Sequence, residues 1–352
     1  LEEDLAHALA KVPAEETEFF IESLCVFQQI NTLRVAAADV SGVLPLMKVS
    51  DHLSDLAEVI LEAVVEKVWH DLAAKHGLPE GRRDRTAAHN PFAILAYGKL
   101  GGYELGYGSD LDLVFLHAAA GGQTTGGPRP IDSAQFFARL GQRVIHILTS
   151  HTRAGRIYDI DMRLRPSGSS GPLVSHIDAF ARYQLKNAWT WEHQALIRSR
   201  TVCGDPAIRR GFDHIRRDVL VRRRDRQRLK REVVDMRRRL MEESAPADDR
   251  FDLKPGPGGI VDIEFMVQYL VLAYAHRYPA LTHWTDNVRL LVTLIDSHLI
   301  NPTTAYRLRE AYLTYRAAVH RLGLQNQPPL LPADRFQSKR DYVIRAWKRF
   351  ME

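Results

Sequence analysis

The sequence predicts an α+β fold in which a mixed sheet with helices is followed by an all-helical bundle. The chain has 352 residues, of which 45% are hydrophobic, enough to form the cores of two domains. Short apolar runs next to glycine-rich turns lie between residues 92 and 165, as in buried strands. Beyond residue 206, apolar residues recur at the spacings of helices. We therefore expect two domains, residues 1–205 and residues 206–352.

The first segment, residues 17–76, predicts helices with one buried face. Its apolar residues recur at intervals of three and four, the period that places side chains on one side of a helix. They include Leu53, Leu56, Ile60, Val64 and Val68. The segment that follows, residues 77–91, is rich in Arg and Asp and predicts a surface loop.

The middle of the chain predicts the sheet. Residues 92–97 (FAILAY) and 110–117 (DLDLVFLH) are compact apolar runs typical of buried strands. Residues 133–149 carry apolar side chains at intervals of four, which favours a helix. Residues 157–165 (IYDIDMRLR) alternate between apolar and charged from Tyr158 onward, which predicts a third strand.

The remainder of the chain reads as helical. Residues 178–200 predict a helix, and the pattern continues beyond residue 206 with a break at 244–259. Three further segments with helical spacing are residues 259–275, 284–297 and 303–322. Helices joined in this way are expected to form a bundle.

The composition limits the environment in which the protein works. Cys25 and Cys203 are the only cysteines, too few for a disulfide framework or a zinc site, so we expect a reducing compartment, the cytoplasm. No stretch is long and apolar enough for a membrane span, and no signal sequence opens the chain, so no membrane partner is expected. Because Leu1 is not an initiator methionine, we also expect the chain to be a fragment.

A dense basic run lies between Arg209 and Arg239, in a chain whose net charge is only +5. Acidic residues are interspersed with the cations, as on a solvated helix with offsetting charges. They are Asp213, Asp218, Asp225, Glu232 and Asp235. The run therefore predicts an exposed helix face, and the alternative is a surface that binds a polyanion, either nucleic acid or an acidic protein.

A carboxylate pair opens the second predicted strand. Asp110 and Asp112 are two residues apart, so in a strand both side chains project from the same face. Two adjacent carboxylates repel one another, and a bound cation reverses the sign of that interaction. Hard oxygen ligands of this kind suit Mg²⁺.

The third predicted strand adds further acids. Its alternation places Asp159, Asp161, Arg163 and Arg165 on one face. If this strand is a neighbour of the second, three or four carboxylates converge. Such an arrangement can hold two metal ions, one for the attacking oxygen and one for the leaving group.

A glycine-rich turn, GKLGG, lies between the first predicted strand and the carboxylate pair. Gly101 and Gly102 lack a Cβ atom, so their backbone can approach a triphosphate and offer N–H donors. Candidate partners for the departing pyrophosphate are Lys99, Arg163 and Arg165, and Ser109 could add a hydroxyl donor. No P-loop, dinucleotide fingerprint or zinc-protease motif is present. The pattern predicts metal-dependent nucleotidyl transfer.

At these residues the sequence resembles the DNA polymerase β type of nucleotidyltransferase, which implies a polymerase β-like sheet. Longer stretches are similar to the glutamine synthetase adenylyltransferase family over nearly the whole chain. They are RVAAADVSGVLPLMKVSDHL, ILAYGKLGGYELGYGSDLDLVFLH, YDIDMRLRPSGSSGPLV, AWTWEHQALIRSR and GGIVDIEFMVQYLVL. The resemblance implies that Asp110, Asp112 and Asp161 are the metal-binding catalytic acids, and that Gly101 and Gly102 form the phosphate turn.

The resemblance also implies a reaction. Members of the family transfer AMP from ATP to a tyrosine of glutamine synthetase and release pyrophosphate, with Mg²⁺, as part of nitrogen-assimilation control. The family has two nucleotidyltransferase halves, and the motifs of this sequence are similar to those of the C-terminal half, which attaches AMP. Phosphorolytic removal of AMP is therefore expected to belong to the other half. Glutamine and the PII signal protein are the implied regulators of the full-length enzyme. Asp161 is a candidate base for the tyrosine hydroxyl.

Two alternative functions remain open at this point. The same site and the basic run suit a template-independent RNA nucleotidyltransferase, although no RNA-binding motif is recognised and nucleic acid is not the expected partner. A catalytically silent binding module is the second alternative, and the presence of all three acids argues against it.

Residues outside the predicted site have structural explanations. Asp262 and Glu264 lie two apart in a predicted helix, so they face different ways and do not predict a second metal pair. Lys254 or Glu264 could instead contact a nucleotide or protein substrate. Trp189, Trp191 and Trp284 are expected to be core or interface anchors, and His193 is expected to be structural.

Overall fold

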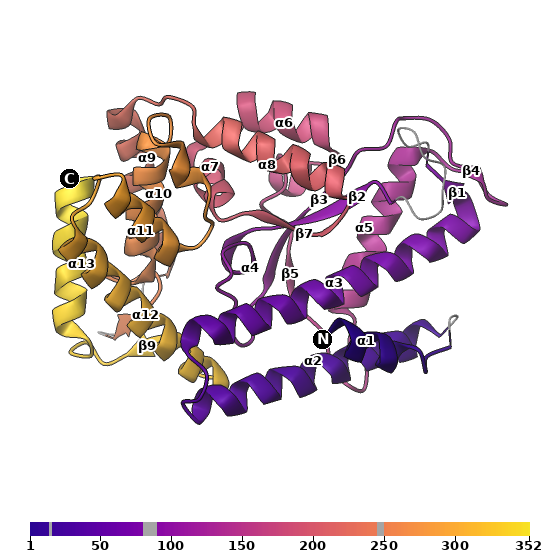
Figure 1. Cartoon of the computed structure of the whole chain (residues 1–352), viewed down its shortest axis with the longest axis horizontal. Helices are drawn as coiled ribbons and strands as arrows, with labels where there is room; N and C mark the ends of the chain where they lie inside the picture. Colours follow the sequence, from indigo (N-terminus) through magenta and orange to yellow (C-terminus); the bar gives the residue numbers. More distant parts are fainter. Residues whose placement is uncertain (14–15, 80–89, 245–249) are drawn as a thin grey trace. The chain divides into compact units, whose positions relative to one another are not determined.

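In the computed structural model, which describes residues 1–13, 16–79, 90–244 and 250–352, the chain divides into two compact units. Unit 1 comprises residues 1–187 and 199–215, and unit 2 comprises residues 188–198 and 216–352. Figure 1 shows the strands labelled β2, β3, β5 and β7 within unit 1 and the helices α9 to α13 within unit 2. The predicted loop at residues 77–91 lies mostly outside the described residues.

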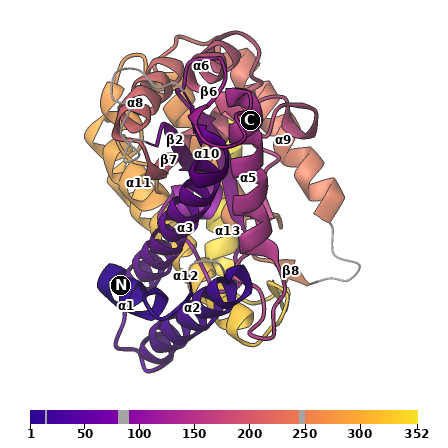
Figure 2. The same cartoon turned by 90° about the vertical axis from the view of Figure 1, so that its right-hand side faces the viewer.

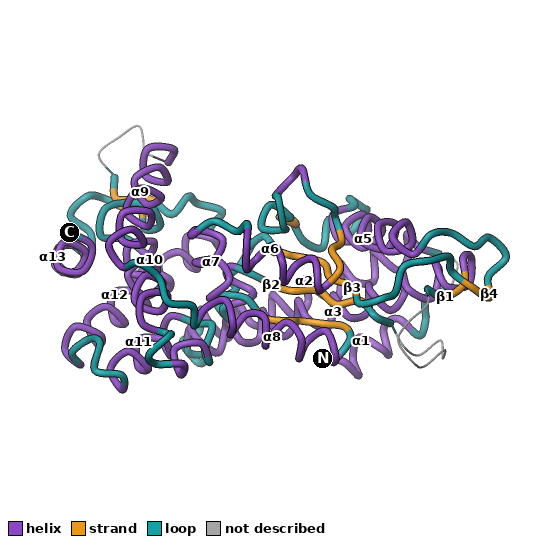
Figure 3. The backbone as a smooth tube through the Cα atoms, turned by 90° about the horizontal axis from the view of Figure 1, so that it is seen from above, coloured by secondary structure: helices purple, strands orange, loops and turns teal. Residues whose placement is uncertain are grey.

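Unit 1 combines a sheet with helices. Its helices are α1 (Glu2–Leu9), α2 (Thr17–Val40), α3 (Leu46–His76), α4 (Gly98–Gly101), α5 (Ser133–Thr149), α6 (Ile177–Lys186) and the first part of α8 (Pro206–Leu220). Its strands are β1 (Gly77–Leu78), β2 (Phe92–Ala96), β3 (Leu111–His117), β4 (Thr125–Gly126), β5 (Ile160–Asp161), β6 (Val174–His176) and β7 (Arg200–Gly204). The strands appear as orange segments in Figure 3.

The main sheet has five strands in a mixed arrangement. Its path is β5-β3-β2-β7, and β6 also pairs with β3. The strands β3 and β7 run antiparallel to β2, whereas β5 and β6 run parallel to β3. Both β5 and β6 therefore lie along the same edge of β3, and β5 pairs with the end of β3 that carries the acidic residues.

Helices cover both faces of this sheet, which explains why every residue of β2 is buried. On one face, Phe92 and Phe115 pack in a core with Trp69 of α3 and Phe136 of α5. Figure 2 shows α3 beside α2 and α5. On the other side of the unit, the ring of Phe180 in α6 lies 5.9 Å from that of Phe212 in α8. Apolar packing on two sides holds the strands rigidly.

Unit 2 is helical, as the sequence predicts. Its helices are α7 (Thr190–Ile197), the end of α8, α9 (Arg226–Ser244), α10 (Ile260–Tyr274), α11 (Asn287–Asp296), α12 (Pro302–Leu324) and α13 (Gln337–Met351). A short antiparallel pair, β8 (Phe251–Asp252) and β9 (Leu330–Leu331), joins two of the connections. The α+β fold class is thus confirmed.

Two elements differ from the prediction. The expected third strand is reduced to β5, because the backbone N–H of Arg163 turns back to donate to Asp161 Oδ1 at 2.8 Å. The expected helix over 178–200 is interrupted, and residues from Arg200 onward form the strand β7. This strand exists because its backbone pairs with β2, a long-range partner that periodicity does not reveal.

The compact units also differ from the expected domains at two short segments. Residues 188–198 belong to unit 2, where Gln194 Nε2 donates to Gln268 Oε1 at 3.0 Å. Residues 206–215 belong to unit 1, where Phe212 packs on Phe180. The chain therefore passes between the units more than once.

Within the described residues, none of the helices is both long enough and apolar enough to cross a membrane. Cys25 and Cys203 are both buried with free thiols.

Candidate active site

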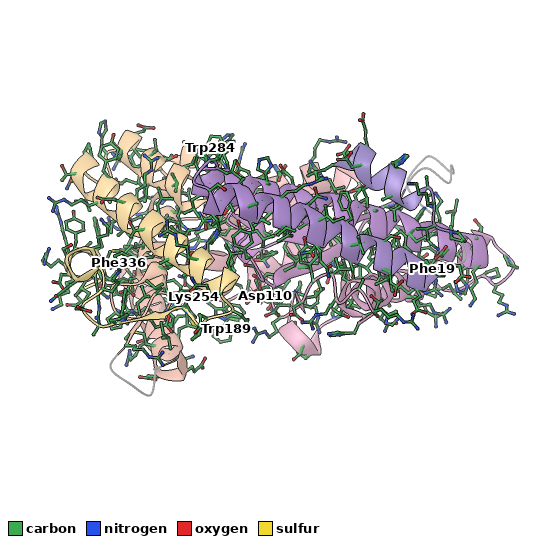
Figure 4. The ribbon with its side chains drawn as sticks, turned by 90° about the horizontal axis from the view of Figure 1, so that it is seen from below. Phe19, Asp110, Trp189, Lys254, Trp284 and Phe336 are labelled. Atoms are coloured by element: carbon green, nitrogen blue, oxygen red, sulfur yellow. The ribbon has the colours of Figure 1, made fainter. Side chains whose placement is uncertain are left out.

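Strand pairing brings the three predicted acids of unit 1 together. In the parallel pair β3–β5, Asp112 lies opposite Asp161, and the N–H of Leu111 donates to the carbonyl of Asp159 at 2.9 Å. Asp110 precedes β3 and is exposed, and it is labelled in Figure 4. One carboxylate oxygen from each of Asp110, Asp112 and Asp161 lies within 4.8 Å of the others.

Asp159, the possible fourth acid, is not part of this cluster. It lies outside the two-residue strand β5, and its carboxylate instead accepts from Arg156 Nη2 at 2.6 Å. The alternation that would have placed Asp159 beside Asp161 requires a longer strand. The structure therefore gathers three carboxylates.

Two cations contact the acidic cluster. Arg163 donates to Asp161 Oδ2 through Nε at 2.8 Å and Nη2 at 2.5 Å. These bonds hold the pKa of the Asp161 carboxyl below its usual range, although burial acts in the other direction. Lys99 Nζ lies 3.7 Å from Asp110 Oδ1. Their predicted contact with a departing pyrophosphate stays a prediction.

Gly98 is a site residue that the sequence reasoning missed. It begins α4 directly after β2, with φ of +56°, and a Cβ atom at this position would lie 2.2 Å from Asp112 Oδ2. Only glycine therefore allows the Asp112 carboxylate to occupy its observed place. The available signal was the glycine that follows the FAILAY strand, but a positive φ is not visible in a sequence.

Gly101 and Gly102 lie at the end of the same turn, and their N–H groups have partners within it. The N–H of Gly101 donates to Tyr97 at 2.9 Å, and that of Gly102 donates to Gly98 at 3.1 Å. The N–H of Tyr97 in turn donates to the carbonyl of Asp112 at 2.9 Å. In this structure the two glycines thus build the turn, and their contact with a phosphate stays a prediction.

Ser109 and Arg165 shape the loops on either side of the acids. The Ser109 hydroxyl accepts from the N–H of Gly106 at 3.2 Å, which closes the turn just before Asp110. Arg165 donates to the carbonyls of Met162 at 2.7 Å and Ser169 at 3.2 Å. Arg165 therefore fixes the loop that follows β5, and its predicted contact with pyrophosphate remains untested.

The donor set fits a divalent cation. Three carboxylates at one strand end place oxygen atoms within 4.8 Å of one another, with Arg163 bonded to Asp161 and Lys99 Nζ 3.7 Å from Asp110 Oδ1. Convergence of like charges is costly, a bound cation offsets that cost, and hard oxygen ligands match Mg²⁺ chemistry. A mixed sheet with such a cluster behind a glycine turn is the arrangement of a metal-dependent nucleotidyltransferase.

Comparison with known proteins specifies the family. A family model described as glutamate-ammonia ligase adenylyltransferase matches residues 1–215, and the chain belongs to this family. Residues 224–336, which lie in unit 2, match a second family model, described as a PII-uridylyltransferase. The family prediction made from the long motifs is confirmed.

Several relatives are each described as a bifunctional glutamine synthetase adenylyltransferase/adenylyl-removing enzyme. The one from Thioalkalivibrio sulfidiphilus is 50% identical over 100% of this chain and 36% of its own length. Those from Hahella chejuensis and Pseudomonas syringae pv. tomato are 46% and 48% identical, over 99% and 98% of this chain and 37% and 36% of their own lengths. The chain therefore spans little more than a third of these relatives.

Proposed function

We propose that unit 1 transfers AMP from ATP to the hydroxyl of a tyrosine on glutamine synthetase and releases pyrophosphate. The observation that carries this proposal is the convergence of Asp110, Asp112 and Asp161 within 4.8 Å. Support for the substrates comes from the family to which the chain belongs and from the names of its relatives. Removal of AMP, the other activity in those names, is assigned to the part of the relatives that this chain does not match.

The reaction needs an attacking oxygen, an α-phosphorus and a leaving group in line. A bond forms between the tyrosine oxygen and the α-phosphorus, the bond from that phosphorus to the bridging oxygen breaks, and the phenol proton passes to solvent. Pyrophosphate departs with the bonding electrons and gains negative charge. Lys99 and Arg163 flank the carboxylates and can bind this charge.

Asp110, Asp112 and Asp161 would hold Mg²⁺, which supplies charge neutralisation of the phosphates and lowers the pKa of the phenol when bound. The carboxylates fix the position of that charge because they are mounted on paired strands with covered faces. The proposal includes two such ions, one for the attacking oxygen and one for the leaving group.

The contacts of Asp161 bear on its candidate role as a base. A carboxyl group whose pKa is depressed by an arginine is a weaker proton acceptor. Asp161 is therefore better suited to be a ligand that stays ionised than to be the group that removes the phenol proton.

The regulators named for the family, glutamine and the PII signal protein, enter only as proposed partners of a longer enzyme. The match of residues 224–336 to a PII-uridylyltransferase model supports a regulatory relationship for unit 2. The chain itself would be tested first without them.

The test is transfer of label from α-labelled ATP with Mg²⁺ to purified glutamine synthetase, or to tRNA as the competing acceptor. We expect label on a synthetase tyrosine with wild-type protein and none with Asp112→Asn. The matched control is Asp159→Asn, which changes a nearby acid outside the cluster and should transfer normally. Label on tRNA, or full transfer by Asp112→Asn, would contradict the proposal.

A further inference from the structure

The N-terminus of α7 in unit 2 presents an exposed tryptophan on a fixed backbone. Trp189 is 70% exposed, whereas Trp69 and Trp347 are 3% and 7% exposed. The neighbouring Trp191 is also exposed, at 37%. Trp189 is labelled in Figure 4. A large apolar ring in water is the kind of side chain that anchors protein interfaces.

Hydrogen bonds hold this corner in place. The N–H of Trp189 donates to Glu192 Oε2 at 2.7 Å, and the hydroxyl of Thr190 donates to Glu232 of α9. One turn further along α7, His193 Nδ1 lies 3.4 Å from Arg224 Nη2. The exposed ring is thus carried by a backbone that is tied to α9 and to the turn before it. An anchor fixed in this way loses little conformational freedom when a partner binds.

Exposed cations lie on α9 and on the turn before it, the two segments to which α7 is bonded. Arg228 donates to Glu232 Oε1 at 2.7 Å, and its side chain is 74% exposed. Arg223 and Arg231, from the turn and from α9, are exposed as well. Arg224 is different, because it donates to backbone carbonyls of Val219 and Leu220 and burial lowers its pKa to about 10. The predicted basic run therefore divides into cations used internally and cations that face solvent on α9 and on the turn before it.

Other cations of the run are used inside unit 2, which narrows the choice of partner. Arg237 forms a bidentate pair with Asp262, and Arg238 pairs with Asp235. The acids Asp225 and Glu232 lie among the exposed arginines. A surface for a nucleic acid backbone needs continuous positive charge, whereas a protein with both apolar and acidic groups fits an aromatic anchor flanked by separate guanidinium groups.

We infer that the corner formed by Trp189, Trp191, Arg223, Arg228 and Arg231 is a docking surface for an acidic segment of the protein that accepts AMP. This inference rests on the proposed function, because it assigns the acceptor protein to unit 2 and the chemistry to unit 1. The tryptophans supply buried apolar contact, and the arginines supply orientation and a salt-dependent association rate. We call this set of residues the Trp189 corner.

The test separates acceptor binding from chemistry by steady-state kinetics with glutamine synthetase. For Trp189→Ala we expect the KM for the synthetase to rise at least tenfold, while the KM for ATP and kcat at saturation stay within twofold. For Arg231→Glu we expect a KM increase that shrinks at high salt. Tyr306→Ala is the matched control, since Tyr306 is 58% exposed on α12 of the same unit. It should leave all constants unchanged.

An unchanged KM in both corner variants, an equal effect of Tyr306→Ala, or a loss confined to kcat would overturn the inference. Direct binding of Asp112→Asn protein to immobilised synthetase separates this inference from the proposed function. If Trp189→Ala weakens binding to the synthetase but the wild type transfers no AMP, the docking surface is supported and the proposed reaction is rejected. If the wild type retains a short RNA on a filter, and Arg231→Glu abolishes this retention but leaves synthetase binding intact, the partner of this surface is a nucleic acid and not a protein.

Discussion

The carboxylate cluster of unit 1 and the buried Asp262 of unit 2 have different surroundings. In unit 1, Asp110, Asp112 and Asp161 lie together at one strand end, and Lys99 Nζ lies 3.7 Å from Asp110 Oδ1. In unit 2, Asp262 is 1% exposed and is held by Arg237 at 2.8 and 2.9 Å and by the N–H of Gly258 at 2.8 Å. The first arrangement gathers three carboxylates, whereas the second pairs a single carboxylate with an arginine and a backbone donor.

The difference distinguishes a binding site from a structural contact. A buried carboxylate with a bidentate arginine and a backbone donor has its hydrogen bonds satisfied. Glu264 repeats this solution with Arg198 and with the hydroxyl of Tyr312 at 3.1 Å. The unit 1 cluster instead brings three carboxylates within 4.8 Å of one another, an arrangement that a bound cation stabilises. The spacing of two between acidic residues thus has different meanings in a strand and in a helix.

The largest expected effect is a loss of activity that is not accompanied by a loss of stability. Asp112→Asn should reduce AMP transfer by about 10³-fold, because one ligand and its charge are lost. The unfolding midpoint in urea should stay the same or rise, since a repulsion between like charges is removed. Label transfer and urea unfolding of the same preparation provide the two measurements. If Asp112→Asn loses activity only because it unfolds, Asp112 has a structural role like that of Asp262.

The converse is expected in unit 2. Asp262→Asn leaves Arg237 buried beside a neutral partner, so the free energy of unfolding should fall by about 3 kcal/mol. Chemical denaturation followed by circular dichroism measures this loss. Glu310→Gln is the control, because its pair with Lys339 is exposed and the midpoint should not move. Equal midpoints for the two variants would show that burial of Asp262 is not what makes its pair important.

Gly98 tests how tightly the unit 1 cluster is positioned. Gly98→Ala should lower kcat by about 10²-fold, because the added methyl group displaces the Asp112 carboxylate. Gly108→Ala is a close control, since Gly108 has φ of +63° and nothing lies within 4 Å of its Cβ position. Both variants should lose about 1 kcal/mol of stability from backbone strain. If both lose activity equally, strain in the turn and not the Asp112 contact controls the site.

A half-buried histidine of unit 1, His117, provides the smallest expected effect. Burial lowers the pKa of His117 to about 4, below its ordinary value near 6.5. The unfolded chain therefore takes up a proton between pH 6.5 and pH 4 that the folded protein does not, so His117 costs stability as the pH falls through this window. The free energy of unfolding, measured in urea, should fall between pH 7.5 and pH 4.5. In His117→Phe this fall should be smaller than in the wild type by about 2 kcal/mol. An identical drop in both proteins would show that His117 is not protected from protonation.

Periodicity was sufficient where local sequence and tertiary burial agree. The helix predicted at residues 133–149 is α5, whose apolar face packs on the sheet and whose first turn is capped by Asp132. The strand at 92–97 is β2 almost unchanged. The strand β7 was missed because Arg200–Gly204 acquires its conformation from pairing with a strand more than 100 residues earlier.

The acids of the site could be predicted, but their surroundings could not. The alternation of residues 158–165 indicated that Asp161 could meet Asp112, which the pairing of β3 with β5 bears out. Asp159 was an equal candidate by spacing, and it is excluded because the strand is too short. The close approach of Gly98 to Asp112 depends on a backbone angle, and the engagement of Arg165 with loop carbonyls depends on a turn. Neither leaves a pattern in the sequence.

The most direct test of the central claim is binding of Mn²⁺, a spectroscopic substitute for Mg²⁺, measured by electron paramagnetic resonance with and without ATP. Wild-type protein and Asp159→Asn should bind Mn²⁺ in the presence of ATP, and Asp110→Asn and Asp112→Asn should bind it at least tenfold more weakly. Equal Mn²⁺ affinity in all four proteins would contradict the assignment of Asp110, Asp112 and Asp161 as a metal-dependent site.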